Sequence, residues 1–360
     1  MIVSELNEKS PSASFRLVAI AKDEASYIAD WIHHHLYFGF DQIHVYVNRT
    51  TDNTIAILKE ITKRYTGVSF EVVDWIDLCP PRVNSALQQI CYAKDLDYAR
   101  RNNFDYIMFL DIDEFWVPND FSTRIKEFVQ PRVDAFAFNW HCELAQDTPF
   151  SPLAENGYYY VHKLCKTLFK TGLNIKNLRV HYPEFGGNVI CRDADGNKVK
   201  MAENNKQTFI DDLCYPKSAF VVHRMYRSKE EYMATLSRGR PSQKGKLKDN
   251  RSGFFAPGML DNEFITSFPK EHYENYIHSC SHFNRFCNIE QLIIDSKNST
   301  LEKWLFDVSC GFGFIQHAPH GTADQVDHRN EIAFVSVAAS ARSGSLKEAI
   351  HAFQTCVRQA

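Results

Sequence analysis

The stretch FDYIMFLDIDEF, residues 104–115, joins an uninterrupted apolar run to three carboxylates. The run Tyr106–Leu110 is short and lacks Gly and Pro, which is typical of a strand that is buried on both faces. Asp111, Asp113 and Glu114 follow it at once. Clustered negative charge at the end of a buried strand is unfavourable unless a cation neutralises it, so the stretch predicts a bound cation.

The spacing of these carboxylates indicates which cation. In an extended chain Asp111 and Asp113 point to one side and Glu114 to the other. Two carboxylates on one side suit Mg²⁺ or Mn²⁺ that bridges a diphosphate. The alternative is a solvated acidic turn that caps the next helix.

Strand and helix patterns alternate on both sides of this stretch, through the first 140 residues. Such alternation predicts an α/β fold with a mostly parallel central sheet flanked by helices. Ligands of these sheets bind beyond the carboxyl ends of the strands. The expected strands are Arg16–Ala21, Gln42–Val47, Val68–Val73, Tyr106–Leu110 and Asp134–Trp140, and the expected helices are Ala25–Phe38, one that starts after Asp52, and Asn84–Arg101.

The pattern changes after residue 140. Residues 156–223 hold short β-like runs, and residues 228–300 are polar, with Pro257 and Pro269 expected to break any long helix. Beyond Asn284 a mainly helical C-terminal extension is expected, and it ends in the amphipathic Leu346–Val357. The apolar stripe of that last segment fits a packing face, a dimer contact or a membrane-surface contact.

A local excess of positive charge lies far from the acidic stretch. Residues 216–251 contain ten Lys and Arg against three acids, in a chain with 41 Lys and Arg, 44 Asp and Glu and a net charge of −3. This excess indicates an anionic partner such as a diphosphate, although a solvated helix with paired charges over Arg227–Arg238 accounts for part of it equally well. Lys166 and Lys170 are two further candidate phosphate contacts.

Two histidine patterns have to be weighed as metal ligands. His223 ends the apolar run SAFVV and could complete a metal site as a neutral imidazole, or be purely structural. His33, His34 and His35 are adjacent in a predicted helix and do not share one face, so they are no metal triad. His33 is expected to be the most exposed of the three.

The composition and the absence of certain motifs argue against several classes of protein. With 44% hydrophobic and 24% charged residues the chain is an ordinary globular protein, and its near-neutral charge argues against nucleic-acid binding. The absence of GxGxxG, Walker A, GxSxG and HExxH patterns argues against dinucleotide oxidoreductases, P-loop NTPases, α/β-hydrolases and zincins. Ten cysteines without a CxxC pair, and no apolar leader, predict a cytoplasmic protein, with peripheral contact at the inner membrane face left open.

Several motifs, in order over residues 15–240, resemble bacterial family 2-like and family 92-like glycosyltransferases. They are AKDE (21–24), YIADWIHHHLYFG (27–39), VYVNRTTDNT (45–54), DYIMFLDIDEF (105–115), Lys166 with RVH (179–181), and VHR (222–224) with Arg238-Gly239.

The resemblance implies a GT-A fold, a nucleotide-diphospho-sugar donor such as a UDP-sugar, and a glycan or glycolipid acceptor in bacterial surface-polysaccharide assembly. It implies a glycosyltransferase domain at 15–240, with a nucleotide-sugar-binding half at 15–140 and an acceptor half at 141–240. Residues 1–14 are then an N-terminal tail and residues 241–360 a mixed or helical C-terminal region.

The resemblance also implies roles for single residues. Asp111, Asp113 and His223 would hold Mn²⁺ or Mg²⁺ on the donor diphosphate. An inverting enzyme needs a catalytic base near the acceptor, for which Glu143 and Asp147 are the candidates. Departures from the family pattern are Asp23 in place of Asn and Thr235 in place of Lys. The residues expected to bind the donor are Glu24, Asn48, Asp74, Gln88, Asp111 and Arg238.

Two other functions are compatible with an acidic turn after a strand. One is a haloacid-dehalogenase-like metal-dependent phosphohydrolase, but Phe115 stands where Thr or Val is usual in that class, and over a hundred residues precede Asp111. The other is a non-catalytic subunit that binds a sugar nucleotide.

Overall fold

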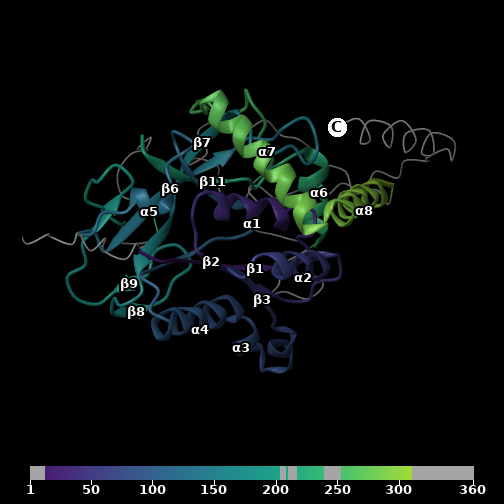
Figure 1. The fold of residues 1–360 in the computed structure, drawn as a ribbon. Helices are drawn as coiled ribbons and strands as arrows, with labels where there is room; N and C mark the ends of the chain where they lie inside the picture. Colours follow the sequence, from purple (N-terminus) through teal and green to yellow (C-terminus); the bar gives the residue numbers. More distant parts are fainter. Residues whose placement is uncertain (1–12, 203–207, 210–216, 239–252, 310–360) are drawn as a thin grey trace, which may run out of the picture.

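The computed structural model describes residues 13–202, 208–209, 217–238 and 253–309 (Figure 1). Strands and helices alternate in the first half, as expected, and β-structure dominates the middle. The strands are β1 (Phe15–Ala21), β2 (Gln42–Val47), β3 (Val68–Val72), β4 (Tyr106–Phe109), β5 (Glu114–Pro118), β6 (Ala135–Glu143), β7 (Asn156–Lys170), β8 (Ile175–Asn177), β9 (Glu184–Phe185), β10 (Cys191–Asp193), β11 (Ala219–His223) and β12 (Phe264–Ser267). The helices are α1 (Ile28–Tyr37), α2 (Thr54–Arg64), the 3₁₀ helix η1 (Asp74–Leu78), α3 (Pro81–Asn84), α4 (Leu87–Arg101), α5 (Ile125–Phe128), α6 (Lys229–Arg238), α7 (Lys270–Cys287) and α8 (Glu290–Ser309).

The central sheet has the strand order β3-β2-β1-β4-β7-β6-β11-β5. The first four strands are parallel, and β7 pairs antiparallel with both β4 and β6. Beyond β6, β11 is parallel to β6, and β5 returns antiparallel to β11. The predicted α/β fold of GT-A type is confirmed.

Helices cover both faces of the parallel half, as the apolar strands require. Along β1, Leu17 and Ala19 point into the core under α1, α2 and α7, and Val18 points into the core under α4 (Figure 1). The helix expected at Asn84–Arg101 begins only at Leu87, because residues 81–84 form the separate short helix α3.

Strand β5 is held along both of its edges. One edge pairs with β11, and side chains of α1 satisfy the backbone of the other. Trp31 Nε1 donates to the carbonyl of Glu114 at 2.8 Å, and His34 Nε2 donates to the carbonyl of Trp116 at 2.9 Å. The Trp116 N–H donates to His35 Nε2 at 3.3 Å. His34 and His35 therefore form hydrogen bonds with the backbone of an edge strand. This agrees with the expectation that the three histidines are no metal triad.

As expected, no described helix runs through Pro257 or Pro269, and the long helices α7 and α8 follow Pro269. Pro269 precedes the first residue of α7, where a missing N–H costs nothing, and α7 and α8 follow almost without interruption. Helix α7 lies over α1 (Figure 1), and Ser279 Oγ lies 2.9 Å from His33 Nε2. His33 is therefore buried instead of exposed. The predicted helix Leu346–Val357 lies outside the described residues.

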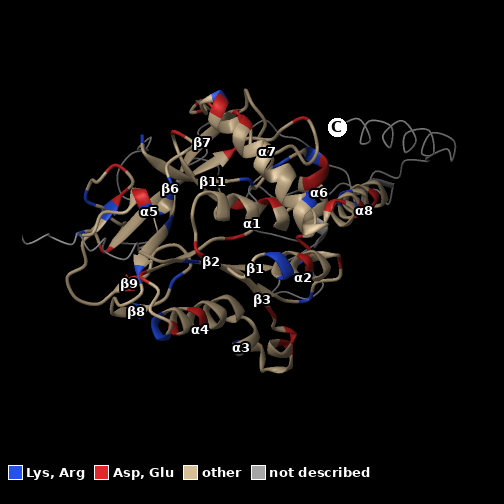
Figure 2. Cartoon of the chain, in the orientation of Figure 1, with Lys and Arg blue, Asp and Glu red and all other residues tan. Residues whose placement is uncertain are grey.

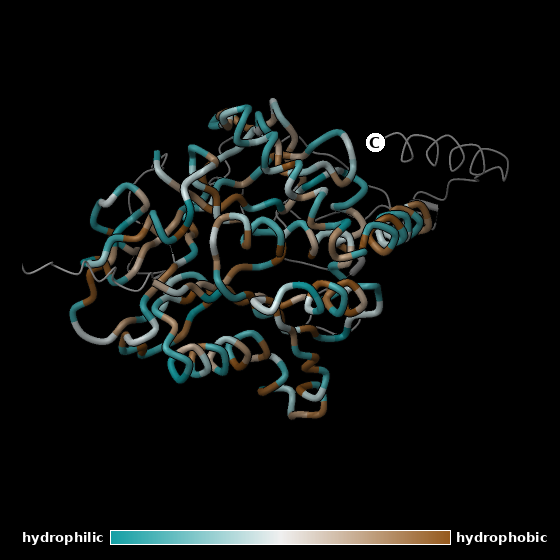
Figure 3. Tube along the Cα trace, in the orientation of Figure 1, coloured by the Kyte–Doolittle hydropathy of each residue, from teal (hydrophilic) through white to brown (hydrophobic). Residues whose placement is uncertain are grey.

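The outer helices have the mixed character of a water-facing surface. Helices α4 and α8 alternate between hydrophilic and hydrophobic residues (Figure 3), and both signs of charge are interspersed on α2, α4 and α8 (Figure 2). Within the described part of the chain, no helix is both long enough and apolar enough to cross a membrane. The predicted division at 14/15 and 240/241 stays a prediction.

One buried histidine predicts how stability depends on pH. His141 of β6 stacks on Phe220 at 4.0 Å between ring centroids, and neither of its ring nitrogens has a hydrogen-bond partner among the described residues. Burial lowers the pKa of His141 to about 3. An unfolded histidine takes up its proton near pH 6.5, so this residue favours folding above pH 6.5 and loses that contribution as pH falls towards 3.

We therefore expect His141→Phe to flatten the decline in stability below pH 6.5. The difference in free energy of unfolding between the variant and wild type should change by about 1.4 kcal/mol per pH unit. Urea unfolding at pH 7.0, 6.0 and 5.0 measures it, with His278→Phe on the exposed side of α7 as the control. Parallel curves for His141→Phe and wild type would contradict the argument.

Candidate active site

The three predicted carboxylates lie in a tight turn between β4 and β5. β4 ends at Phe109, and the Glu114 N–H donates to the Asp111 carbonyl at 3.0 Å, which closes the turn. The expectation of an extended chain at Asp111–Glu114 is therefore wrong. The turn instead directs the Glu114 carboxylate back beneath it, where Oε2 accepts the Asp111 N–H at 2.8 Å.

Strand pairing brings His223 to this turn. Because β11 runs antiparallel to β5, His223 lies opposite Glu114 in the register. Its Nε2 is 3.6 Å from Asp113 Oδ2, and the next residue, Arg224, donates its N–H to the Asp113 carbonyl at 2.8 Å. The Trp140 ring packs against the imidazole at 4.2 Å between centroids. A carboxylate oxygen and an imidazole nitrogen thus face each other at the edge of the sheet.

A buried lysine lies beneath the other two carboxylates. Lys166 of β7 is 0% exposed, and its Nζ is 2.9 Å from Glu114 Oε2 and 3.3 Å from Asp111 Oδ2. The Asp111 carboxylate is 40% exposed, and its Oδ1 accepts a hydrogen bond from Gln88 Nε2 at 3.4 Å. Lys166 is not the exposed phosphate contact that its position between apolar residues suggested. Lys170 pairs instead with Asp134 at 3.0 Å.

The electrostatics of this group follow from its burial. Burial opposes the charge on Lys166, but the carboxylates of Asp111 and Glu114 outweigh it and raise the pKa of the ammonium. Burial also raises the pKa of Glu114, and repulsion from Asp111 and Asp113 acts in the same direction. Lys166 is therefore a permanent cation beneath the turn.

The other predicted donor residues lie at the carboxyl ends of neighbouring parallel strands. Glu24 follows β1 and is largely buried, and its N–H donates to Thr54 Oγ1 at 2.9 Å. Asn48 follows β2 and is fully buried, with Nδ2 3.5 Å from Asp74 Oδ1. Asp74, which follows β3, is exposed and also accepts the Arg49 N–H at 2.7 Å. The fold thus places these residues and the acidic turn on one edge of the sheet.

The basic segment is described only in part. Arg238 is the last residue of α6, and its side chain lies outside the described residues, as do residues 239–252. Arg227 is buried, with its guanidinium 3.4 Å from the centroid of the Tyr27 ring. Burial opposes its charge, but attraction to Tyr27, Glu24 and Asp113 raises its pKa. A solvated helix over Arg227–Arg238 was one of the two interpretations that the sequence left open, and the burial of Arg227 does not fit it.

The two candidate catalytic bases have different surroundings. Glu143 ends β6 and is 1% exposed; its Oε2 accepts from Arg224 Nε at 2.6 Å and its Oε1 from Gln146 Nε2 at 2.9 Å. Both oxygens are occupied, which is typical of a structural ion pair. Asp147 lies exposed in the loop that follows.

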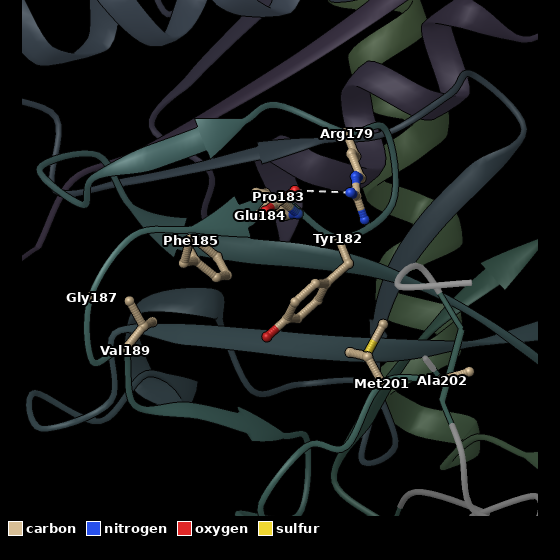
Figure 4. A pocket seen from close by; sticks show the side chains of 9 residues that line it. All are labelled: Arg179, Tyr182, Pro183, Glu184, Phe185, Gly187, Val189, Met201 and Ala202. Atoms are coloured by element: carbon tan, nitrogen blue, oxygen red, sulfur yellow. Dashed lines mark hydrogen bonds and ion pairs between the residues drawn. The ribbon is translucent and has the colours of Figure 1, made fainter. Parts of the chain in front are cut away.

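A cavity of about 400 Å³ is lined by residues between Arg179 and Ala202 (Figure 4). Tyr182 and Phe185 line it with rings 5.5 Å apart and perpendicular, and Arg179 pairs with Glu184 at 2.9 Å at its rim. The same segment contains His181, whose ring packs on Trp140 at 5.0 Å. Trp140 also packs against His223, so ring contacts connect the segment that lines the cavity with the histidine beside the acidic turn.

Comparison with known protein families identifies the class. Residues 18–152 match the family model of glycosyltransferase family 92. This segment runs from β1 to the loop after β6 and contains the acidic turn. The resemblance to family 92 seen in the motifs is thereby confirmed over residues 18–152.

Similar solved structures include S. aureus TarS, with 10% identity and a TM-score of 0.24 over 44% of this chain and 28% of that one. A cytidylyltransferase from Leptospira borgpetersenii serovar Hardjo-bovis has 13% identity and a TM-score of 0.23, over 44% of this chain and 60% of its own. A glycosyltransferase involved in the glycosylation of the major capsid of PBCV-1 has 9% identity and a TM-score of 0.21, over 43% and 60%. The chain thus covers less than two thirds of each of these proteins. No curated protein matches it.

The environment of Glu143 predicts its role. We expect Glu143→Gln to lower the free energy of unfolding by about 3 kcal/mol, because it leaves the buried Arg224 guanidinium without its charge partner. Urea unfolding measures the loss. Glu184→Gln, which breaks the more exposed pair with Arg179, should cost less than about 1 kcal/mol. Equal effects of the two substitutions would contradict a structural role for Glu143.

Proposed function

We propose that this glycosyltransferase moves a sugar from a UDP-sugar to a glycan or glycolipid acceptor, with Mn²⁺ or Mg²⁺ bound to the donor diphosphate. The resemblance to bacterial enzymes supports a role in surface-polysaccharide assembly. The observation that carries the proposal is the approach of His223 Nε2 to Asp113 Oδ2 at 3.6 Å, directly beside a turn with two further carboxylates.

The donor atoms of this pair fit a divalent ion that is shared with a substrate. Among the described residues, no three His, Cys, Asp or Glu side chains converge as a complete metal site. A pair of one carboxylate and one imidazole leaves most coordination positions to diphosphate oxygens and water, which is how Mg²⁺ and Mn²⁺ commonly bind with nucleotide substrates. The ion would serve as a Lewis acid that stabilises charge on the departing nucleoside diphosphate.

The surrounding residues have complementary tasks in this proposal. Asp111, Asp113 and His223 hold the ion on the donor diphosphate, and Gln88 orients Asp111. Asn48 and Asp74 lie at the ends of β2 and β3, where the nucleoside would bind at the sheet edge. The donor role of Glu24, the approach of Arg238 to the phosphates and the use of Asp147 as a base stay proposals carried over from the family.

The acceptor is proposed to enter the cavity lined by Tyr182 and Phe185. Aromatic faces pack against the apolar faces of sugar rings, and the rim pair of Arg179 and Glu184 offers hydrogen bonds to hydroxyls. The ring contacts of His181 with Trp140, and of Trp140 with His223, support this proposal, because they connect the segment that lines the cavity with a proposed metal ligand.

Calorimetric titration of UDP into the purified protein, with and without Mn²⁺, tests the proposal. We expect Mn²⁺ to strengthen UDP binding, and Asp113→Asn and His223→Ala each to weaken the Mn²⁺-dependent binding at least tenfold, because each removes one protein ligand of the ion. Asp97→Asn and His278→Ala, at exposed positions of α4 and α7, are the matched controls.

Three results would count against this function. Metal-independent UDP binding that survives Asp113→Asn would remove the ion from the donor site. Equal losses in the control variants would indicate damage to the fold. If neither UDP nor GDP binds with Mn²⁺ present, the proposed nucleotide-diphospho-sugar donor is wrong.

A further inference from the structure

A lysine side chain from β7 contacts the carboxylates of the acidic turn. Asp111, Asp113 and Glu114 place three carboxylates within four residues, and the ammonium of Lys166 contacts two of them. Both Lys166 and Glu114 are 0% exposed. A carboxylate cluster of this kind was expected to need a bound ion, yet part of its charge is already neutralised by a side chain from another strand.

Strand pairing and the hydrogen bonds of neighbouring residues fix the position of Lys166. Lys166 lies in the middle strand of the sheet, opposite Phe138 of β6. The residues on either side of Lys166 are hydrogen-bonded to His181. Thr167 Oγ1 donates to the His181 carbonyl at 2.8 Å, and His181 Nδ1 donates to the Cys165 carbonyl at 3.2 Å. A side chain that is fixed and wholly buried in this way cannot reach a phosphate in solution, so its partners are the carboxylates above it.

We propose that Lys166 is the resident counter-ion of the acidic turn: it keeps Asp111 and Glu114 in place when no metal is bound, and it weakens the binding of a divalent metal to the turn. The proposal rests on the metal site of the proposed function. It makes Lys166 a positioning residue, which acts on the ion and the donor only through the carboxylates.

The charge of Lys166 has two opposite effects: it stabilises the metal-free protein, and it weakens the binding of a metal ion. Without the ammonium, the carboxylates of Asp111 and Glu114 repel each other beside Asp113, and one of them is buried, so the metal-free protein is destabilised. With the ammonium, an approaching divalent cation meets a fixed positive charge that is 3.3 Å from Asp111. Coulomb repulsion between this buried ammonium and a cation bound by the same carboxylates opposes metal binding.

The test substitutes Lys166 by Met, which keeps the length of the side chain and removes the charge. Mn²⁺ alone is titrated into each protein by calorimetry, and Tm is measured in EDTA and in saturating Mn²⁺. We expect Lys166→Met to bind Mn²⁺ at least tenfold more tightly than wild type, to have a Tm several degrees lower in EDTA, and to regain more Tm than wild type on addition of Mn²⁺. Lys170→Met on the same strand, whose ammonium pairs with Asp134, should change none of these.

A purely structural lysine would give a different result. Its loss would lower Tm and either leave Mn²⁺ affinity unchanged or reduce it, and that outcome overturns the proposal. Lys166→Gln retains an N–H donor for Glu114 and should show the same tightening of Mn²⁺ binding with a smaller loss of Tm. If Mn²⁺ fails to restore the folded state of a variant that is unfolded in EDTA, the proposal is also overturned.

The same titration separates this inference from the function on which it depends. If wild type binds Mn²⁺ and Asp113→Asn abolishes the binding, but Lys166→Met binds with wild-type affinity, the counter-ion role fails and the metal site stands. If neither wild type nor Lys166→Met binds Mn²⁺ at millimolar concentration, the metal site itself fails and the counter-ion role fails with it.

Discussion

The hydrogen bonds along both edges of β5 are the constraint on which the site depends. β11 pairs with one edge, and the indole and imidazole side chains of α1 satisfy the other. A strand held in this way fixes the turn that precedes it, and with it the carboxylates of Asp111 and Asp113. The same pairing places His223 beside Asp113. The register between β5 and β11 therefore both fixes the turn and positions the histidine that faces it.

The charges around the turn form a second level of organisation. Lys166 lies beneath it from β7, and the buried guanidinium of Arg227 lies close enough to attract Glu24 and Asp113. Buried charges are costly unless they are paired, so these two cations and the carboxylates stabilise one another and the geometry of the edge. Such fixed positive charge would favour the proposed anionic donor next to these carboxylates.

Much of the first half of the fold could be predicted from the sequence. The apolar runs of β1, β2 and β4 and the amphipathic pattern of α1 are local, and they specified an α/β sheet with its acidic residues at one edge. The exposure of His33 was predicted wrongly. Whether α7 covers α1 depends on packing between segments far apart in the chain.

The sequence by itself determined which residues carry the chemistry, because a strand that runs directly into carboxylates is a local pattern that is visible before the fold is known. It determined the class as well, through motifs whose order matches family 92. Only the tertiary structure decided which side chains contact those carboxylates: Lys166 and His223 come from strands whose neighbours in the sheet cannot be read from local periodicity. Burial converts Lys166 from a candidate phosphate contact into an internal cation, because a side chain's solvent access depends on everything packed around it.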